Sequence, residues 1–200
     1  MTGGAERRLE ADVKRLEAAI GPVPPAEERP AFVILSGLPG SGKSHVAREL
    51  AKRYPLAVLH IDALRKTLVP QPQYTQAEHA RTFAAVHALI DRLLARKVSV
   101  LYDATNLKEE YRRPLYEIGE RNGARVKVVR VVSPEEVALR RLRERREGSG
   151  ERWSSDADED VYEMMRLEAE PVAGPHAEVD ASGDVSEAVD KIVRKLREDV

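Results

Sequence analysis

Short apolar runs alternate along the chain with longer segments whose apolar residues recur every three or four positions. The runs are rich in β-branched residues and predict five strands, while the periodic segments between them predict helices. We expect the strands at residues 31–36, 56–61, 98–102, 126–132 and 177–181. Because strands and helices alternate, the pattern indicates a three-layer α/β/α fold with a mostly parallel, five-stranded sheet.

The helical periodicity also divides the chain into segments. It predicts helices at 5–20, from Ser44 to about 54, at 76–97, 109–122 and 185–199, with two more between about 134 and 170. Residues 66–75 contain two prolines and are expected to form a loop. The proline-rich stretch 21–30 follows the first helix, so we predict a flanking helix at 1–20, a linker at 21–30 and one domain over 31–200.

The stretch after the first predicted strand is a glycine-rich loop. It reads Gly37-Leu38-Pro39-Gly40-Ser41-Gly42-Lys43-Ser44 and fits G-x-x-x-x-G-K-S/T, the phosphate-binding P-loop. Such a loop turns its backbone N–H groups toward an anion, and the helix that follows adds partial positive charge. Lys43 is expected to reach the β- and γ-phosphates, and the Ser44 hydroxyl to bind Mg²⁺. His45 completes the expected nucleotide-binding segment; the alternative is a plain glycine turn between strand and helix.

Two aspartates follow predicted strands, Asp62 after the second and Asp103 after the third. Because the carboxyl ends of parallel strands meet at one edge of a sheet, both are expected near the P-loop. A kinase needs a carboxylate to accept the proton of the attacking hydroxyl, and acidic groups near Mg²⁺. We assign the base to Asp62, with Arg65 in reach of the same substrate, and Asp103 to the metal's outer shell or to orienting Ser44. The alternative is that each aspartate forms a turn or caps a helix.

Five arginines, at positions 140, 141, 143, 145 and 146, lie on the helix predicted after residue 134. Arg141 and Arg145 are four apart and share a face, and a glycine-bearing stretch at 148–150 precedes a second helix. This arrangement indicates a lid at about 134–170 that brings positive charge over the γ-phosphate. The alternatives are a solvated helix face and a nucleic-acid patch, and an aromatic content of 4% disfavours a base-stacking platform.

Composition narrows the class of protein. The 200 residues carry 33 basic and 34 acidic side chains, so any binding to nucleic acid would need a local patch. The absence of cysteine excludes disulfides and thiol catalysis. The five histidines show no ligand spacing, so we expect structural roles and no zinc, with a minor site role open for His60. No apolar run approaches 18 residues, and we expect a cytoplasmic protein without membrane association.

Together these blocks resemble a known group of enzymes. The chain resembles the P-loop kinases of the polynucleotide-kinase and zeta-toxin type, which have an AAA-type ATP-binding domain. The resemblance rests on the P-loop at 37–44, Asp62-x-x-Arg65, Asp103-Ala104-Thr105-Asn106, Arg112 and the pair Arg141 and Arg145. The resemblance covers about 31–183. It implies ATP as donor, Mg²⁺ as metal and a hydroxyl acceptor beside Asp62 and Arg65.

The resemblance also implies roles for individual residues. It implies that Asp103, Thr105 and Asn106 lie on the substrate side, that Arg112 contacts substrate or phosphate, and that the two lid arginines contact the ATP phosphates. The function predicted is a kinase acting on a polynucleotide 5′-hydroxyl or on a small metabolite. Two alternatives stay open: a regulatory ATPase without phosphotransfer, and a zeta-type toxin that phosphorylates nucleotide sugars.

Overall fold

The computed structural model describes residues 2–149 and 157–198. Its centre is a parallel sheet of five strands: β1 (Ala31–Ser36), β2 (Ala57–His60), β3 (Val100–Asp103), β4 (Arg125–Val132) and β5 (His176–Asp180). Their order across the sheet is β2-β3-β1-β4-β5, and every pairing is parallel. The predicted five-stranded α/β fold is confirmed, and each predicted strand is present within two residues of its expected bounds.

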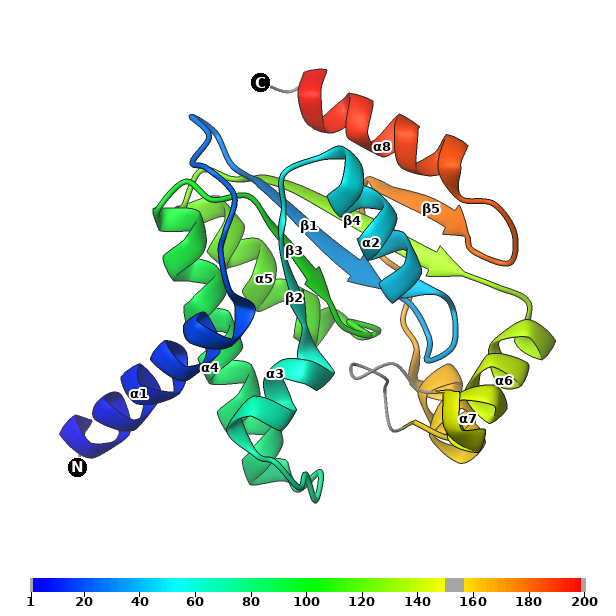
Figure 1. The fold of residues 1–200 in the computed structure, drawn as a ribbon, viewed down its shortest axis with the longest axis horizontal. Coiled ribbons are helices and arrows are strands. Elements are labelled where there is room, and N and C mark those ends of the chain that lie inside the picture. Colours follow the sequence, from blue (N-terminus) through cyan, green and yellow to red (C-terminus); the bar gives the residue numbers. More distant parts are fainter. Residues whose placement is uncertain (1, 150–156, 199–200) are drawn as a thin grey trace.

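Helices cover both faces of the sheet, as Figure 1 shows. The alternating side chains of β1 separate two cores: Phe32 and Ile34 face one core, and Val33 and Leu35 face the other. The first core is closed by α1 (Thr2–Ile20), α3 (Ile61–Leu68), α4 (Gln76–Ala95) and α5 (Glu109–Arg121). The second is closed by α2 (Lys43–Arg53) and α8 (Ser186–Glu198).

Helix α1 packs against α3 and α4 on the flank of the domain. Val13 and Leu16 are buried in the first core. Nε and Nη2 of Arg81 donate hydrogen bonds to the carboxylate of Asp12, each at 2.7 Å, and these bonds hold the pKa of Asp12 below its usual range. The apolar stripe of residues 5–20 is therefore a packing face.

After β2 the chain forms helix α3, which the sequence analysis did not predict. The helix runs through Leu68, so the predicted loop at 66–75 is restricted to 69–75. Ile61, Leu64 and Leu68 are buried at helical spacing, and this burial stabilises a short helix that the nearby prolines obscure in the sequence. Asp62 and Arg65 consequently lie on a helix rather than at the end of a strand.

Two helices lie apart from these layers, beyond the carboxyl ends of the strands (Figure 1). They are α6 (Glu135–Glu144), which continues as a π-helical turn at Arg145–Ser149, and α7 (Glu159–Glu168). A small core of Ala138, Leu142 and Tyr162 joins them. The predicted lid has this pair of helices, and most of the stretch that joins them lies outside the described residues, which stop at 149 and resume at 157.

Candidate active site

The P-loop joins β1 to α2 and forms a backbone cradle. Gly40 and Gly42 have φ angles of 76° and 102°, which side-chain-bearing residues rarely adopt. A Cβ at Gly40 would lie 2.5 Å from the carbonyl oxygen of Ala138. The loop therefore lies close to the neighbouring backbone. No side chain caps the N-terminus of α2, so this helix end stays open to an anion.

Lys43 lies inside this cradle. Its Nζ donates a hydrogen bond to the carbonyl oxygen of Leu38 at 2.8 Å. Burial lowers the pKa of Lys43, while the charges of Asp103 and Asp62 act in the opposite direction. A phosphate is a stronger acceptor than a carbonyl, so the ammonium is well placed to exchange its hydrogen bond with Leu38 for one with a phosphate of a bound nucleotide.

Three side chains from three elements meet beside the cradle. Ser44 Oγ donates a hydrogen bond to Asp103 Oδ2 at 2.7 Å, and His60 Nδ1 lies 2.8 Å from the same oxygen. His60 and Asp103 are direct partners in the register of β2 and β3, which brings the two side chains together. Burial would raise the pKa of Asp103, but the contacts with His60 and Ser44 and the charge of Lys43 lower it, so the carboxylate is kept ionised.

The residues present fit a nucleotide with Mg²⁺. Hydroxyl and carboxylate oxygens are the ligands that Mg²⁺ prefers, and Ser44 and Asp103 supply both. The glycines at 40 and 42 also keep the loop free of side chains where a phosphate would lie against its backbone.

Asp62 and Arg65 lie on α3, at the β2 side of the cradle. Asp62 is in the first turn of that helix, and its charge acts on Lys43. Arg65 is only 4% exposed, and its Nε and Nη1 have no hydrogen-bond partner among the described residues. Its Nη2 lies 3.5 Å from His79 Nδ1, and its guanidinium carbon lies 5.4 Å from the centre of the Tyr74 ring.

A cavity of about 1390 Å³ connects these groups. Its walls include most of the predicted site residues: Pro39, Gly40, Gly42, Lys43, Ser44, His45, Asp62, Arg65, Asp103, Thr105, Asn106, Arg141 and Arg145. Gly37, Leu38 and Ser41 do not line it. The structure therefore gathers residues that are up to about a hundred positions apart in the sequence into one site.

Arg112 does not line this cavity, and its predicted contact with substrate or phosphate stays an untested prediction. It is fully buried, and its guanidinium donates hydrogen bonds to Glu109, to the carbonyl oxygen of Asn106 and to that of Pro171. The Asn106 amide in turn donates to the carbonyl oxygen of Leu35 at 2.7 Å. Arg112 therefore holds the loop after β3 in place, and Asn106 fixes that loop to β1 while one side of it lines the cavity.

The arginine cluster divides into two groups. Arg140 pairs with Glu144, and Arg143 with Glu159, on exposed surfaces, as the solvated-face alternative predicts. Arg141 instead donates to the carbonyl oxygens of Gly40, at 3.3 Å, and Ala181, at 2.6 Å. Burial, with the charge of Arg145, lowers the pKa of Arg141. Arg141 is thus held against the P-loop.

The sequence analysis missed several side chains at this site. It left only a minor site role open for His60, which contacts Asp103, and it treated His79 as structural although His79 lines the cavity. His45, which it placed in the nucleotide-binding segment, lines the cavity as expected. Tyr74, Phe83 and Tyr111 line the cavity as well, and they come from three separate segments that no sequence pattern links.

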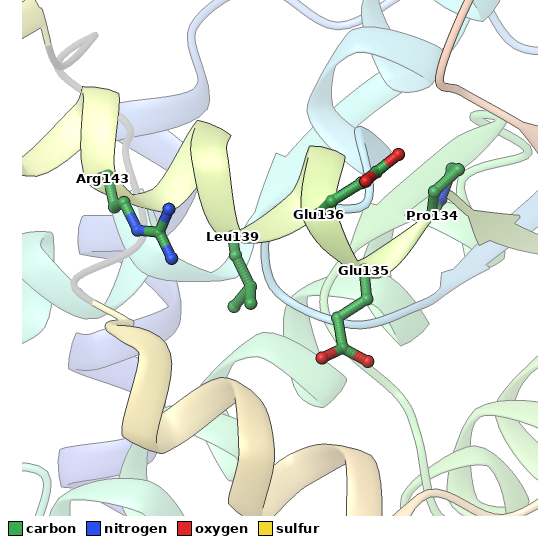
Figure 2. Close-up of a pocket in the computed structure, with 5 residues that line it drawn as sticks. All are labelled: Pro134, Glu135, Glu136, Leu139 and Arg143. Carbon is green, nitrogen blue, oxygen red and sulfur yellow. The ribbon is translucent and has the colours of Figure 1, made fainter.

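A second, smaller pocket of about 480 Å³ lies along α6. Figure 2 shows Glu135 and Leu139 extending from α6 on the side of the neighbouring helix, with Arg143 further along. Arg143 is already paired with Glu159 of α7. This pocket holds none of the predicted site residues, so the large cavity is the candidate active site.

Comparison with known families identifies the class. The AAA_33 family model, described as an AAA domain, matches residues 32–172, and the chain belongs to this family of P-loop domains. No protein of curated function matches the chain by sequence. None of the helices in the described ranges is long and apolar enough to cross a membrane.

Solved structures share the fold at low sequence identity. A gluconokinase from Sinorhizobium meliloti is 21% identical, with a TM-score of 0.61, over 86% of this chain and 97% of that one. The Mycobacterium tuberculosis APS kinase CysC, solved with AMPPNP and APS, is 22% identical, with a TM-score of 0.61, over 87% and 99%. Chaetomium thermophilum Kti12, solved with ADP-AlF3, is 23% identical, with a TM-score of 0.65, over 84% and 97%.

Proposed function

We propose that this protein is an ATP-dependent kinase that transfers the γ-phosphate to a hydroxyl group of its acceptor. One observation carries the proposal: Asp62 and Arg65 line the same cavity as Lys43 and Ser44. A P-loop alone accounts for nucleotide binding, whereas a carboxylate and a buried guanidinium beside it supply what an acceptor needs. The likeness to a gluconokinase and an APS kinase supports the same class of reaction.

The P-loop cradle forms the half of the site that binds the nucleotide. The P-loop amides and Lys43 bind the β- and γ-phosphates, as in other P-loop proteins. Ser44 and Asp103 would hold Mg²⁺, which would neutralise charge on the phosphates. Arg141 on α6 and Arg145 in the π-helical turn that follows it line the same cavity and stabilise the charge that develops during transfer.

Helix α3 supplies the residues of the half of the site that binds the acceptor. Asp62 accepts the proton of the acceptor hydroxyl as its oxygen attacks the γ-phosphorus; the bond to the β-phosphate oxygen breaks, and ADP leaves. Nε and Nη1 of Arg65 are buried and have no hydrogen-bond partner among the described residues. A buried donor of this kind favours an acceptor that carries an anionic group.

The proposal is tested by following labelled γ-phosphate from ATP, with Mg²⁺, to a panel of acceptors. The panel contains gluconate, nucleotide sugars, adenosine 3′-monophosphate, 5′-hydroxyl RNA and DNA oligomers, and water. Label on any organic hydroxyl is the expected result. Label on nucleotide sugars alone would assign the zeta-toxin activity. Release of free phosphate at a rate that no acceptor changes would overturn the proposal in favour of a regulatory ATPase.

A further inference from the structure

Several large apolar side chains are exposed in the candidate active site. Four large apolar side chains are exposed in the described part of the chain: Tyr74 at 41%, Tyr111 at 43%, Met164 at 52% and Leu167 at 80%. All of these except Leu167 line the large cavity. Large apolar groups that gather in one concave site usually bind a ligand. Phosphate groups do not require such surface, so a ring of the donor or of the acceptor is the expected occupant.

The aromatic members form a continuous wall. The Phe83 ring on α4 lies 6.1 Å from the Tyr111 ring on α5, with an angle of 13° between the planes. His79, one turn earlier on α4, lies 6.1 Å from Phe83 at 24°, and the Tyr74 ring lies 6.2 Å from His79. We call these four residues the aromatic wall. Three of its rings are close to parallel, so they present similar orientations to a planar partner.

Helix α7 supplies an apolar surface of a different kind to the same cavity. Met164 and Met165 both line it, and thioethers make favourable contacts with aromatic rings. The end of α7 is joined to the start of α5, which carries Tyr111: Lys108 Nζ lies 2.7 Å from a carboxylate oxygen of Glu168. The methionines are therefore held on the side of the cavity that contains the aromatic wall.

The sheet order assigns the wall to the acceptor half of the cavity. The P-loop follows the central strand β1, with β3 and β2 on one side and β4 and β5 on the other. Arg141 is bonded to Ala181, next to the end of β5, on the second side. Asp62 follows β2 on the first side, and Tyr74 packs over Arg65 of the same helix. The wall thus lies beside the proposed base and not beside Arg141.

We propose that the acceptor carries a planar aromatic ring, which stacks on the aromatic wall, with its hydroxyl toward Asp62 and an anionic group toward Arg65. This inference rests on the proposed kinase function and specifies its substrate class. A linear sugar acid supplies an anionic group that can accept hydrogen bonds from Arg65, but it leaves Tyr74, Tyr111 and Met164 exposed to water. A heteroaromatic base linked to a phosphorylated sugar satisfies both features, whether it is a free nucleotide or the end of a nucleic acid.

The test compares two probes that share a free hydroxymethyl group and a phosphate and differ in the ring. Adenosine 3′-monophosphate has the ring, and methyl ribofuranoside 3-phosphate lacks it but keeps the phosphate on the same carbon. Binding of each probe is measured by calorimetry with AMPPNP and Mg²⁺ present, and transfer is measured with ATP. The ring-bearing probe is expected to bind and react with a KM roughly five- to 150-fold lower, which is the range that base stacking provides. A 5′-hydroxyl oligonucleotide then distinguishes a mononucleotide acceptor from a nucleic-acid end.

Variants locate the effect at the wall. Tyr111→Leu and Tyr74→Leu are expected to raise the KM for adenosine 3′-monophosphate by about tenfold and to leave the KM for ATP within about twofold. Met164→Ala is matched with Leu167→Ala on the same helix, since Leu167 is exposed outside the cavity. Met164→Ala is expected to raise the KM for the ring-bearing probe, and Leu167→Ala to leave it unchanged.

The outcomes separate this inference from the kinase proposal. If the ring-bearing probe binds at the wall but only free phosphate is released, the substrate class stands and the kinase function fails. If gluconate or methyl ribofuranoside 3-phosphate reacts as well as the ring-bearing probe, the kinase stands and the inference is overturned. A rise in the KM for ATP in Tyr111→Leu would also overturn it, because the wall would then bind the donor's adenine. If no probe binds, the inference is overturned.

Discussion

His60 Nδ1 lies 2.8 Å from Oδ2 of Asp103, the same oxygen that accepts the hydrogen bond from Ser44. The parallel register pairs His60 with Asp103 at the ends of β2 and β3, so the contact is built into the sheet. The imidazole fixes the carboxylate, and the carboxylate fixes the hydroxyl that we assign to Mg²⁺. Outer partners of this kind set the orientation of metal ligands.

Removal of this support should weaken Mg²⁺ binding. His60→Ala is expected to raise the Mg²⁺ concentration that gives half the maximal transfer rate by roughly 10- to 100-fold. The measurement is a Mg²⁺ titration of transfer at saturating ATP. His176→Ala is the matched control, because His176 is exposed and its ring forms a hydrogen bond with the carbonyl oxygen of Gly174. Equal Mg²⁺ dependence in the two variants would return His60 to a structural role.

The two neighbouring arginines on α6 should behave differently. Arg141 contacts the P-loop backbone, while Arg140 is exposed and pairs with Glu144. Arg141→Ala is expected to lower kcat by about 10²-fold or more, and Arg140→Ala to leave it within about twofold. Initial rates at saturating ATP, with a thermal melt of each variant, make the comparison. Equal rates in both variants would show that the whole cluster is a solvated face.

Arg112 should affect stability and not catalysis. In Arg112→Met the buried carbonyl oxygen of Asn106 loses its donor, which costs about 1–3 kcal/mol in the free energy of unfolding. Arg113→Met is the control, since Arg113 is exposed, and a change within about 0.5 kcal/mol is expected. Urea unfolding measures both. An unchanged stability with a raised KM for the acceptor would support the role in substrate binding that the family resemblance implies.

The ion pair between α1 and α4 should make stability depend on pH in the acid range. Hydrogen bonds from Arg81 lower the pKa of Asp12 in the folded state, so this carboxylate adds stability above its ordinary pKa and loses that contribution as the pH falls through the lowered value. Asp12→Asn is therefore expected to be less stable than the parent at pH 7, and the difference should shrink below about pH 4. Denaturant unfolding across this range measures it. A difference that stays constant down to pH 2 would show that the pair acts only through packing.

Local sequence patterns predicted most of the fold, because strand burial and P-loop spacing are properties of contiguous residues. Helix α3 was missed because eight residues give a weak periodic signal and two prolines follow closely. The aromatic wall was missed for a different reason. A content of 4% aromatic residues disfavours a stacking surface when averaged over the chain, but Tyr74, Phe83 and Tyr111 converge only when α4 and α5 pack together. Arg112 follows the D-A-T-N block in sequence, yet its burial is a tertiary property.

The measurement that tests the central claim most directly is the single-turnover rate of γ-phosphate transfer in Asp62→Asn, beside the binding of AMPPNP. Asp62 is assigned to the acceptor's proton, so the substitution is expected to lower the transfer rate by roughly 10²- to 10⁴-fold while AMPPNP affinity stays within about twofold. An unchanged transfer rate would contradict the kinase mechanism proposed here. A loss of AMPPNP affinity equal to the loss of rate would show that Asp62 supports the nucleotide and not the acceptor.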